Sequence, residues 1–277
     1  MPVWMNNSKS KSMTYLFIAI AAYVFIVAFM YIKQRDYIYF PNRQPTPISA
    51  ALQDFQKISV MTEDGVSLSA LYKPPQHTDK PVIVFFHGNG GDIGDRVYRP
   101  QPYISEGYGF LLAEYRGFWG NEGIPSEQGL YADAQAYMEW LIHEQSVPPE
   151  QIVVFGESLG TGVSVEMAVR YPDIKALLLL APFTSLADVG QVRMRYLPVR
   201  WLMKDRYNNL AKINNIRTSL LVLHGRKDDI VPFGFGENLF MAAPEPKEMA
   251  VFDQGNHVDL LDHGEAQRIL RFLKELK

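Results

Sequence analysis

Hydrophobic residues in the middle and C-terminal parts of the chain form short, nearly continuous runs that alternate with longer stretches of helical spacing. Runs such as VIVFF, ALLLL and LLVL are typical of strands covered on both faces, because neither alternating set of side chains is polar. Strands are expected at 82–86, 110–114, 152–155, 176–180, 220–223 and 248–252, and helices at 127–145, 158–171 and 262–276. This alternation predicts an α/β fold with a mostly parallel central sheet flanked by helices.

Two segments depart from this alternation. The runs at 56–61 and 66–72 flank an Asp-Gly pair, which indicates an antiparallel hairpin ahead of the parallel strands. The segment 186–216 is rich in arginine and has mixed helical spacing. We expect it to form a small helical cap over the functional site, with a plain helical connection as the alternative.

The longest apolar run lies near the N-terminus, where residues 15–32 (YLFIAIAAYVFIVAFMYI) carry no charge. As a helix it would extend about 27 Å, close to the roughly 30 Å hydrocarbon core of a bilayer. The run exceeds the apolar part of a usual signal peptide, and no cleavage site of small residues follows it. It therefore predicts an uncleaved single-pass anchor, with a signal peptide or a buried helix as alternatives. Flanking positive charges are nearly balanced and indicate no side for the remaining chain.

The expected organisation is a short tail at 1–14, the transmembrane helix at 15–32, a proline-rich linker at 33–50 and one domain at 51–277. Composition narrows the chemistry of that domain. A net charge of −3 gives no electrostatic reason to expect nucleic-acid binding. The absence of cysteine excludes disulfides, thiolate metal sites and a cysteine nucleophile. Histidines are scattered and no nucleotide-binding motif occurs, so neither a metal nor a cofactor is expected.

The sequence GESLG at 156–160 follows the apolar run at 152–155 and begins a stretch of helical spacing. A serine between a strand and a helix in a G-x-S-x-G pattern is typical of a sharp turn that exposes its hydroxyl group. Small residues two positions before and after the serine allow the strand and helix to approach each other. We therefore predict that Ser158 is a catalytic nucleophile, with a plain helix N-cap as the alternative.

A serine hydroxyl becomes an effective nucleophile when a base accepts its proton and a carboxylate orients that base. In folds with this serine turn, the acid and then the base follow the serine along the chain. Three histidines follow Ser158. His224 ends an apolar strand and His263 begins the last helix, whereas His257 lies in a polar loop between the last strand and that helix. We expect His257 to be the base.

The acid is expected after the strand that carries LLVL, where Asp228 and Asp229 are adjacent and spacing does not separate them. The reaction also needs backbone N–H groups that stabilise a developing oxyanion. One is the N–H of Leu159, at the start of its helix. The other is expected in the glycine-rich sequence HGNGG at 87–91, where Asn89 holds the favoured position.

With these motifs the chain resembles the α/β-hydrolase superfamily, and within it the Bem46-like group of membrane-anchored hydrolases. The resemblance covers nearly the whole chain after the apolar run. The group's H-G-x-x-D-x-x-V-P pattern implies that Asp228 is the acid and supports Asn89 as an oxyanion donor. The group usually has DYRGYG where this chain has EYRGFW, a departure that concerns the shape of the pocket. The matching motifs are IYFP at 38–41, FHGNGG at 86–91, EYRGFWG at 114–120, GESLG at 156–160, HGRKDDIVP at 224–232 and NH at 256–257.

Similar proteins include carboxylesterases and protein depalmitoylases, so the resemblance implies hydrolysis of carboxylic esters or thioesters through an acyl-enzyme on Ser158. The expected partners are a small or lipid-like acyl ester and the membrane. Phe118, Trp119 and Phe183 are candidates to line an acyl pocket, with simple packing as the alternative. Two other functions stay open: a peptidase or amidase that uses the same residues, and a membrane-tethered binding protein without activity.

Overall fold

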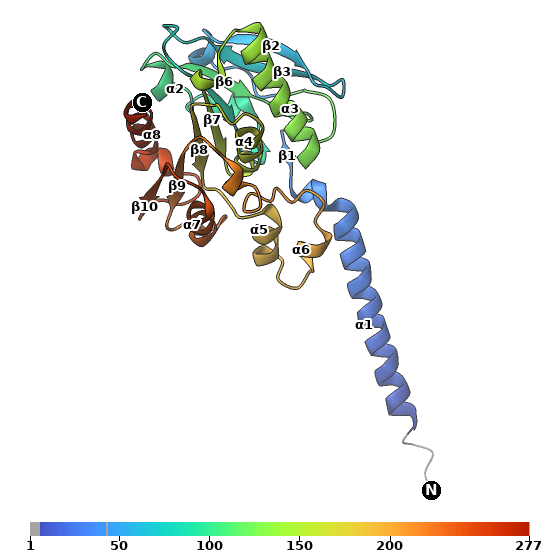
Figure 1. Ribbon diagram of the computed structural model, residues 1–277. Coiled ribbons are helices and arrows are strands. Elements are labelled where there is room, and N and C mark those ends of the chain that lie inside the picture. Colours follow the sequence, from blue (N-terminus) through green and yellow to red (C-terminus); the bar gives the residue numbers. More distant parts are fainter. Residues whose placement is uncertain (1–5, 43, 277) are drawn as a thin grey trace.

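The computed structural model describes residues 6–42 and 44–276, in which a long N-terminal helix leads into one α/β body (Figure 1). Helix α1 (Asn6–Lys33) extends away from the body and ends in a 3-10 turn, η2 (Gln34–Tyr37). The segment from Lys11 to Tyr37 is long and apolar enough to cross a membrane, and no residue of its apolar part is buried. Most of the expected tail at 1–14 is helical from Asn6 onward, while residues 1–5 lie outside the described part.

The body is built around one sheet of eight hydrogen-bonded strands. The strand order is β10 (Lys247–Phe252), β9 (Ser219–Gly225), β8 (Ala176–Leu180), β7 (Ile152–Glu157), β4 (Val82–Phe86), β6 (Gly109–Ala113), β3 (Ser67–Lys73) and β2 (Gln56–Met61). Neighbours from β10 to β6 are parallel, whereas β3 and β2 complete the sheet as antiparallel strands. The predicted mostly parallel sheet is therefore confirmed.

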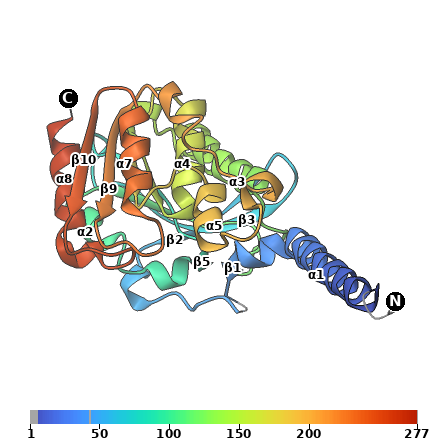
Figure 2. The same cartoon turned by 90° about the horizontal axis from the view of Figure 1, so that it is seen from below.

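Helices cover both faces of the sheet (Figure 2). One face carries α3 (Glu127–Glu139), α4 (Leu159–Arg170) and α7 (Phe233–Ala242). The other face carries α2 (Gln101–Ile104) and α8 (Glu265–Glu275). Strand β4 shows why its run is continuously apolar, since alternate residues of VIVFF join the two separate core clusters on opposite faces of the sheet.

Two helices differ from the expectation in their extent, and a further helix, α7, was not expected. Helix α3 ends at Glu139 and continues as a π-helical turn, η5 (Trp140–Glu144). The last helix starts as a 3-10 turn, η8 (Leu260–His263), because Gly264 adopts a φ of +89° before α8 begins. Helix α7 was not expected, since its glycines weaken a helical pattern. Further 3-10 turns are η3 (Ala50–Leu52), η4 (Ile93–Arg96) and η6 (Pro149–Gln151).

Within the segment expected as a linker at 33–50, the part around Ile38 and Tyr39 packs against the body. Ile38 and Tyr39 are buried, and strand β1 (Phe40–Pro41) pairs in parallel with β5 (Gly90–Gly91). Ile38 and Tyr39 are therefore part of the core, because their burial removes aromatic and aliphatic surface from water.

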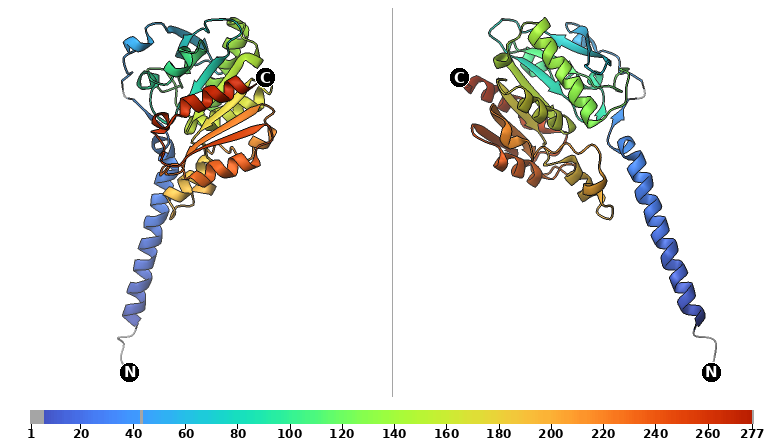
Figure 3. Two further views of the ribbon diagram at one scale, coloured as in Figure 1. Left: turned by 90° about the vertical axis from the view of Figure 1, so that its left-hand side faces the viewer. Right: turned by 45° about the vertical axis from the view of Figure 1, so that its right-hand side comes forward.

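The segment 186–216, called the cap segment from here on, lies at the end of the body from which α1 emerges (Figure 3). It contains α5 (Leu186–Arg193), α6 (Val199–Leu202) and the 3-10 turn η7 (Ile213–Asn215). The guanidinium of Arg35 donates two hydrogen bonds, of 2.8 and 3.1 Å, to the Asp205 carboxylate. These charge-assisted bonds fix the cap segment to the end of α1.

Candidate active site

Ser158 lies in the turn between β7 and α4, with a φ of +51° and a ψ of −115°. A positive φ is unfavourable for a residue with a Cβ atom, so neighbouring contacts must hold this conformation. The N–H of Ser158 donates to the Leu180 carbonyl at 2.9 Å, and its own carbonyl accepts the N–H of Thr161 at 2.9 Å. The serine is therefore held in the strained turn that its sequence motif predicts.

Close backbone contact explains why the motif has glycine on both sides of the serine. A Cβ atom added at Gly160 would lie 2.0 Å from the Phe86 carbonyl oxygen, in the neighbouring strand β4. One added at Gly156 would lie 2.5 Å from the Gly160 carbonyl oxygen. Both contacts are with backbone atoms, which a rotamer change cannot relieve, so helix α4 can approach the sheet only without these side chains.

Gly160→Ala should therefore destabilise the fold, by about 3 kcal/mol, because the added methyl group forces α4 away from β4. The measurement is the urea midpoint of the full chain in detergent, followed by tryptophan fluorescence. Gly234→Ala in α7 is the matched control, since a Cβ there meets nothing within 4 Å. We expect it to be neutral or stabilising by up to about 1 kcal/mol. Equal midpoints for the two variants would contradict the close-contact explanation.

The structure brings Ser158, His257 and Asp228 into one hydrogen-bonded row. His257 Nε2 lies 3.0 Å from Ser158 Oγ, and His257 Nδ1 lies 2.7 Å from Asp228 Oδ2. The three residues follow β7, β9 and β10 at their carboxyl ends, where parallel sheets place functional groups. This arrangement can carry a proton from the serine hydroxyl to the imidazole while the carboxylate orients the ring.

The Asp228 carboxylate is held in its ionised form. Its Oδ1 accepts the N–H groups of Ile230 and Val231, at 2.9 and 2.7 Å. Its Oδ2 also lies 3.3 Å from Nε2 of the buried His224. Burial alone would raise the pKa of Asp228, but hydrogen bonds from His224, His257 and the backbone outweigh it and hold the pKa well below its ordinary value.

The neighbouring carboxylate has a different environment. Asp229 is exposed, and its backbone carbonyl accepts a hydrogen bond from the Arg193 guanidinium on α5. Asp228, by contrast, is 7% exposed and faces His257. The geometry thus separates two residues that spacing along the chain did not.

The two residues expected as oxyanion donors belong to the serine turn and to the loop after β4. Leu159 is the first residue of α4, so its N–H has no acceptor within the helix. The loop after β4 passes close to the serine, since a Cβ added at Gly88 would lie 3.5 Å from Ser158 Cβ. In that loop, Asn89 donates its side-chain amide to the Ile38 carbonyl at 2.8 Å, and its own carbonyl accepts the Phe40 N–H at 2.8 Å.

A buried polar cluster supports the same loop, and sequence reasoning did not assign it. His87 Nε2 lies 2.7 Å from Oε1 of Glu114, and both side chains are fully buried. The second Glu114 oxygen accepts the Ile93 N–H at 2.9 Å, and the Tyr115 hydroxyl donates to the His87 carbonyl at 2.9 Å. The sequence signal for this cluster was the pair of polar residues, His87 and Glu114, that directly follow two apolar strands.

A second buried cluster lies beside the serine turn. Arg99 donates to Glu157, the residue before the serine, at 2.5 Å and to Glu265 at 2.6 Å. Burial lowers the pKa of Arg99, but the two carboxylates outweigh it and hold the pKa above its ordinary value. The cluster ties the serine turn to helix α8, and no local sequence pattern indicates it because its partners are far apart in the chain.

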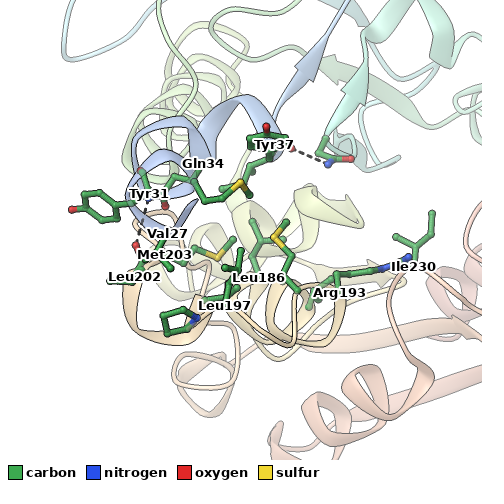
Figure 4. A pocket seen from close by; sticks show the side chains of 18 of the residues that line it. Val27, Tyr31, Gln34, Tyr37, Leu186, Arg193, Leu197, Leu202, Met203 and Ile230 are labelled. Carbon is green, nitrogen blue, oxygen red and sulfur yellow. Dashed lines mark hydrogen bonds between the residues drawn. The ribbon is translucent and has the colours of Figure 1, made fainter. Parts of the chain in front are cut away.

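A largely apolar cavity of about 540 Å³ lies between α1 and the cap segment (Figure 4). Its lining includes Asn89 and the pair Asp229 and Ile230, so it reaches the loop after β4 and the loop after β9 that carries Asp228. Arg193 and Gln34 are polar side chains in an otherwise mostly aliphatic wall. The volume and lining suit a small apolar ligand.

The three aromatic residues expected in an acyl pocket do not line this cavity. Phe118 is fully buried and packs edge-on against His87. Trp119 donates its indole N–H to the Thr46 carbonyl at 2.8 Å, and Phe183 is 1% exposed in the core on the α4 face. Their environment is that of packing residues, because close-packed core neighbours occupy the space around their rings.

Comparisons with known proteins agree on similarity to alpha/beta hydrolases and to bem46. A family model described as alpha/beta hydrolase fold matches residues 81–209. An uncharacterized protein of Mycobacterium tuberculosis strain H37Rv is 42% identical over 257 residues, which cover 90% of this chain and 90% of that protein. Protein bem46 of Schizosaccharomyces pombe is 28% identical, over 93% of this chain and 91% of that protein.

One relative carries an activity in its name. Lysophosphatidylserine lipase ABHD12 of Danio rerio is 32% identical over 197 residues, which cover 64% of this chain and 51% of that lipase. Among solved structures, an esterase of Pyrococcus furiosus superposes with a TM-score of 0.71 at 21% identity, over 86% of this chain and 99% of that chain. This structural likeness supports the fold described above.

Proposed function

On the premise that the chain belongs to the Bem46-like group of alpha/beta hydrolases, we propose that it is a serine hydrolase that cleaves carboxylic esters or thioesters. The observation that carries this proposal is the row of Ser158, His257 and Asp228, with 3.0 Å between serine and imidazole and 2.7 Å between imidazole and carboxylate. The lipase and esterase names among similar proteins support the same class of reaction.

In the proposed reaction, Ser158 Oγ attacks the carbonyl carbon of the substrate as His257 Nε2 accepts the hydroxyl proton. The N–H groups of Leu159 and Asn89 stabilise the oxyanion. His257 then donates the proton to the leaving oxygen or sulfur, which departs and leaves an acyl ester on Ser158. Water attacks this ester with His257 as base, releasing the acid and restoring the serine. Asp228 stays ionised and stabilises the imidazolium.

We assign the apolar cavity between α1 and the cap segment to the acyl group, and the cap segment to covering the site. Apolar lining and the approach to Asn89 support this assignment, because the acyl carbonyl must lie beside the oxyanion donors. The length and composition of α1 support a role as a single-pass anchor.

A comparison of matched esters and amides tests the proposal. Purified full chain in detergent should hydrolyse p-nitrophenyl esters and leave p-nitroanilides of the same acyl groups intact. Activity should rise with acyl length from acetate until the cavity is filled, because each buried methylene contributes about 0.8 kcal/mol. Faster cleavage of anilides would indicate an amidase instead. A folded sample that hydrolyses no activated ester would indicate a binding protein.

A further inference from the structure

We propose that the tip of the cap segment, residues 192–204, enters the membrane beside α1, from the interface near Lys204 inward to Tyr196, so that the apolar cavity is entered from the bilayer. The inference deepens the proposed hydrolase function and rests on it for the substrate, a single-chain acyl ester that resides in the leaflet. We call residues 192–204 the cap tip.

The level of the cap tip along α1 is the first observation. The Tyr23 hydroxyl donates to the Tyr196 carbonyl at 2.8 Å. Tyr23 lies about 15 Å along the helix from Lys33, at 1.5 Å per residue. The uncharged stretch from Met13 to Ile32, which contains the apolar run at 15–32, extends about 30 Å, close to the thickness of the hydrocarbon core. When α1 spans the bilayer, the Tyr196 carbonyl therefore lies about halfway through the core, whereas Lys204, whose Nζ lies 4.3 Å from the centre of the Tyr31 ring, stays near the level at which the helix leaves the bilayer.

The surface of the cap tip is the second observation. Three large apolar side chains are exposed there, Val192 by 55%, Tyr196 by 75% and Trp201 by 86%. Residues 192–204 contain no acidic residue, and Arg200 pairs with Asp188 from outside the tip. Aromatic rings beside cations are typical of the interface between bilayer and water, where rings sit among headgroups and cations meet anionic lipid. The basic residues of the tip are Arg193, Arg195, Arg200 and Lys204.

The position of the cavity is the third observation. Its walls include Val27 and Tyr31 of α1 and Leu197 and Leu202 of the cap tip (Figure 4). Asn89 also lines the cavity. An acyl chain that passes between α1 and the cap tip would stay in apolar surroundings until its ester group reaches the oxyanion loop. This path keeps the chain out of water, which would oppose its transfer.

Depth-dependent fluorescence quenching tests the position of the tip. The full chain carrying Trp4→Phe is reconstituted into vesicles of phosphatidylcholine and phosphatidylglycerol with brominated acyl chains, which quench nearby tryptophan. Trp119 and Trp140 are almost fully buried in the body, so Trp201 should give most of the quenching. Adding Trp201→Phe should remove it. Quenching that is unchanged by Trp201→Phe, or absent before it, would overturn the proposal and leave the cap tip in water or against another protein.

A rate comparison tests entry from the bilayer. Tyr196→Ser combined with Trp201→Ser should lower hydrolysis of a long-chain ester embedded in vesicles by about tenfold, because the tip loses its interfacial apolar surface. Hydrolysis of water-soluble p-nitrophenyl acetate should be unchanged. Met61→Ser on β2 is the control, since Met61 is 65% exposed on a strand remote from α1 (Figure 1). Unchanged hydrolysis of the vesicle ester, or an equal loss on both substrates, would overturn bilayer entry.

The two measurements separate this inference from the hydrolase function. Hydrolysis of soluble esters without Trp201 quenching would overturn the membrane position of the cap tip and leave the proposed function standing. Quenching of Trp201 without hydrolysis of any ester would support the membrane position and overturn the proposed function together with the substrate path.

Discussion

Ser158→Ala is expected to lower kcat for p-nitrophenyl esters by at least about 10⁴-fold and to abolish labelling by a fluorophosphonate probe. The variant lacks the oxygen that attacks the carbonyl carbon, and no group on His257 or Asp228 replaces it. Backbone donors at Leu159 and Asn89 would still polarise a bound ester, so a small residual rate is expected. Activity is measured with full chain in detergent, and labelling by gel fluorescence.

Ser164→Ala is the matched control for this prediction. Ser164 lies on the same helix α4, is fully buried, and its hydroxyl has no hydrogen-bond partner within the described part of the chain. The same atom is therefore removed about two turns away without loss of a described hydrogen bond. Ser164→Ala should retain probe labelling and ester hydrolysis. Equal labelling of the wild type and Ser158→Ala would show that the probe reacts elsewhere and that the nucleophile is another residue.

Asp228→Asn is expected to lower kcat by about 10³ to 10⁴-fold with little change in KM. A neutral amide does not stabilise the imidazolium that forms on His257. Its N–H₂ group can also donate to Nδ1, and the ring proton would then lie on Nε2. In that tautomer Nε2 cannot accept the proton of the serine hydroxyl. The acceptor bonds that Oδ1 makes with the N–H groups of Ile230 and Val231 can survive, so the loop should stay in place.

Asp229→Asn provides an isosteric control at the adjacent position. Its side chain is exposed and lies outside the row of Ser158, His257 and Asp228. We expect kcat within about twofold of the wild type, as for surface substitutions that break no buried interaction. If Asp229→Asn inactivated the protein and Asp228→Asn did not, the acid would have to be reassigned and the loop after β9 would adopt another arrangement during the reaction.

The sheet could be predicted from the sequence because its signal is local. A strand covered on both faces must be apolar at nearly every position, as in β4, β6 and β8, and few other structures require that pattern. The serine turn was predictable for the same reason, since GESLG contains the last two residues of β7 and the turn that follows directly. Two-residue strands such as β1 and β5 carry no periodic pattern, so only their pairing in space defines them.

Parts of the candidate site depend on contacts between residues far apart in the chain, and these were not predictable. Arg99 meets Glu265 across 166 positions, and Arg35 meets Asp205 across 170. The cavity exists only because such contacts bring α1 and the cap segment together. Phe118 and Trp119 were expected to line a pocket but are buried. Aromatic residues in a loop after a strand can either complete the core or line a pocket, and the local sequence does not distinguish the two.

The connection between α1 and the body has a consequence for the selection of substrates. Three contacts hold the end of α1 against the body. They are the ion pair of Arg35 with Asp205, the 2.9 Å contact between the hydroxyls of Tyr39 and Tyr207, and the pairing of β1 with β5. With Ser158 as the proposed nucleophile and α1 as the proposed anchor, the reaction would take place at a fixed height relative to the lipid surface. The protein would then cleave ester bonds that lie at the depth set by its anchor. Identical ester bonds deeper in the membrane or farther out in the water would not reach the serine.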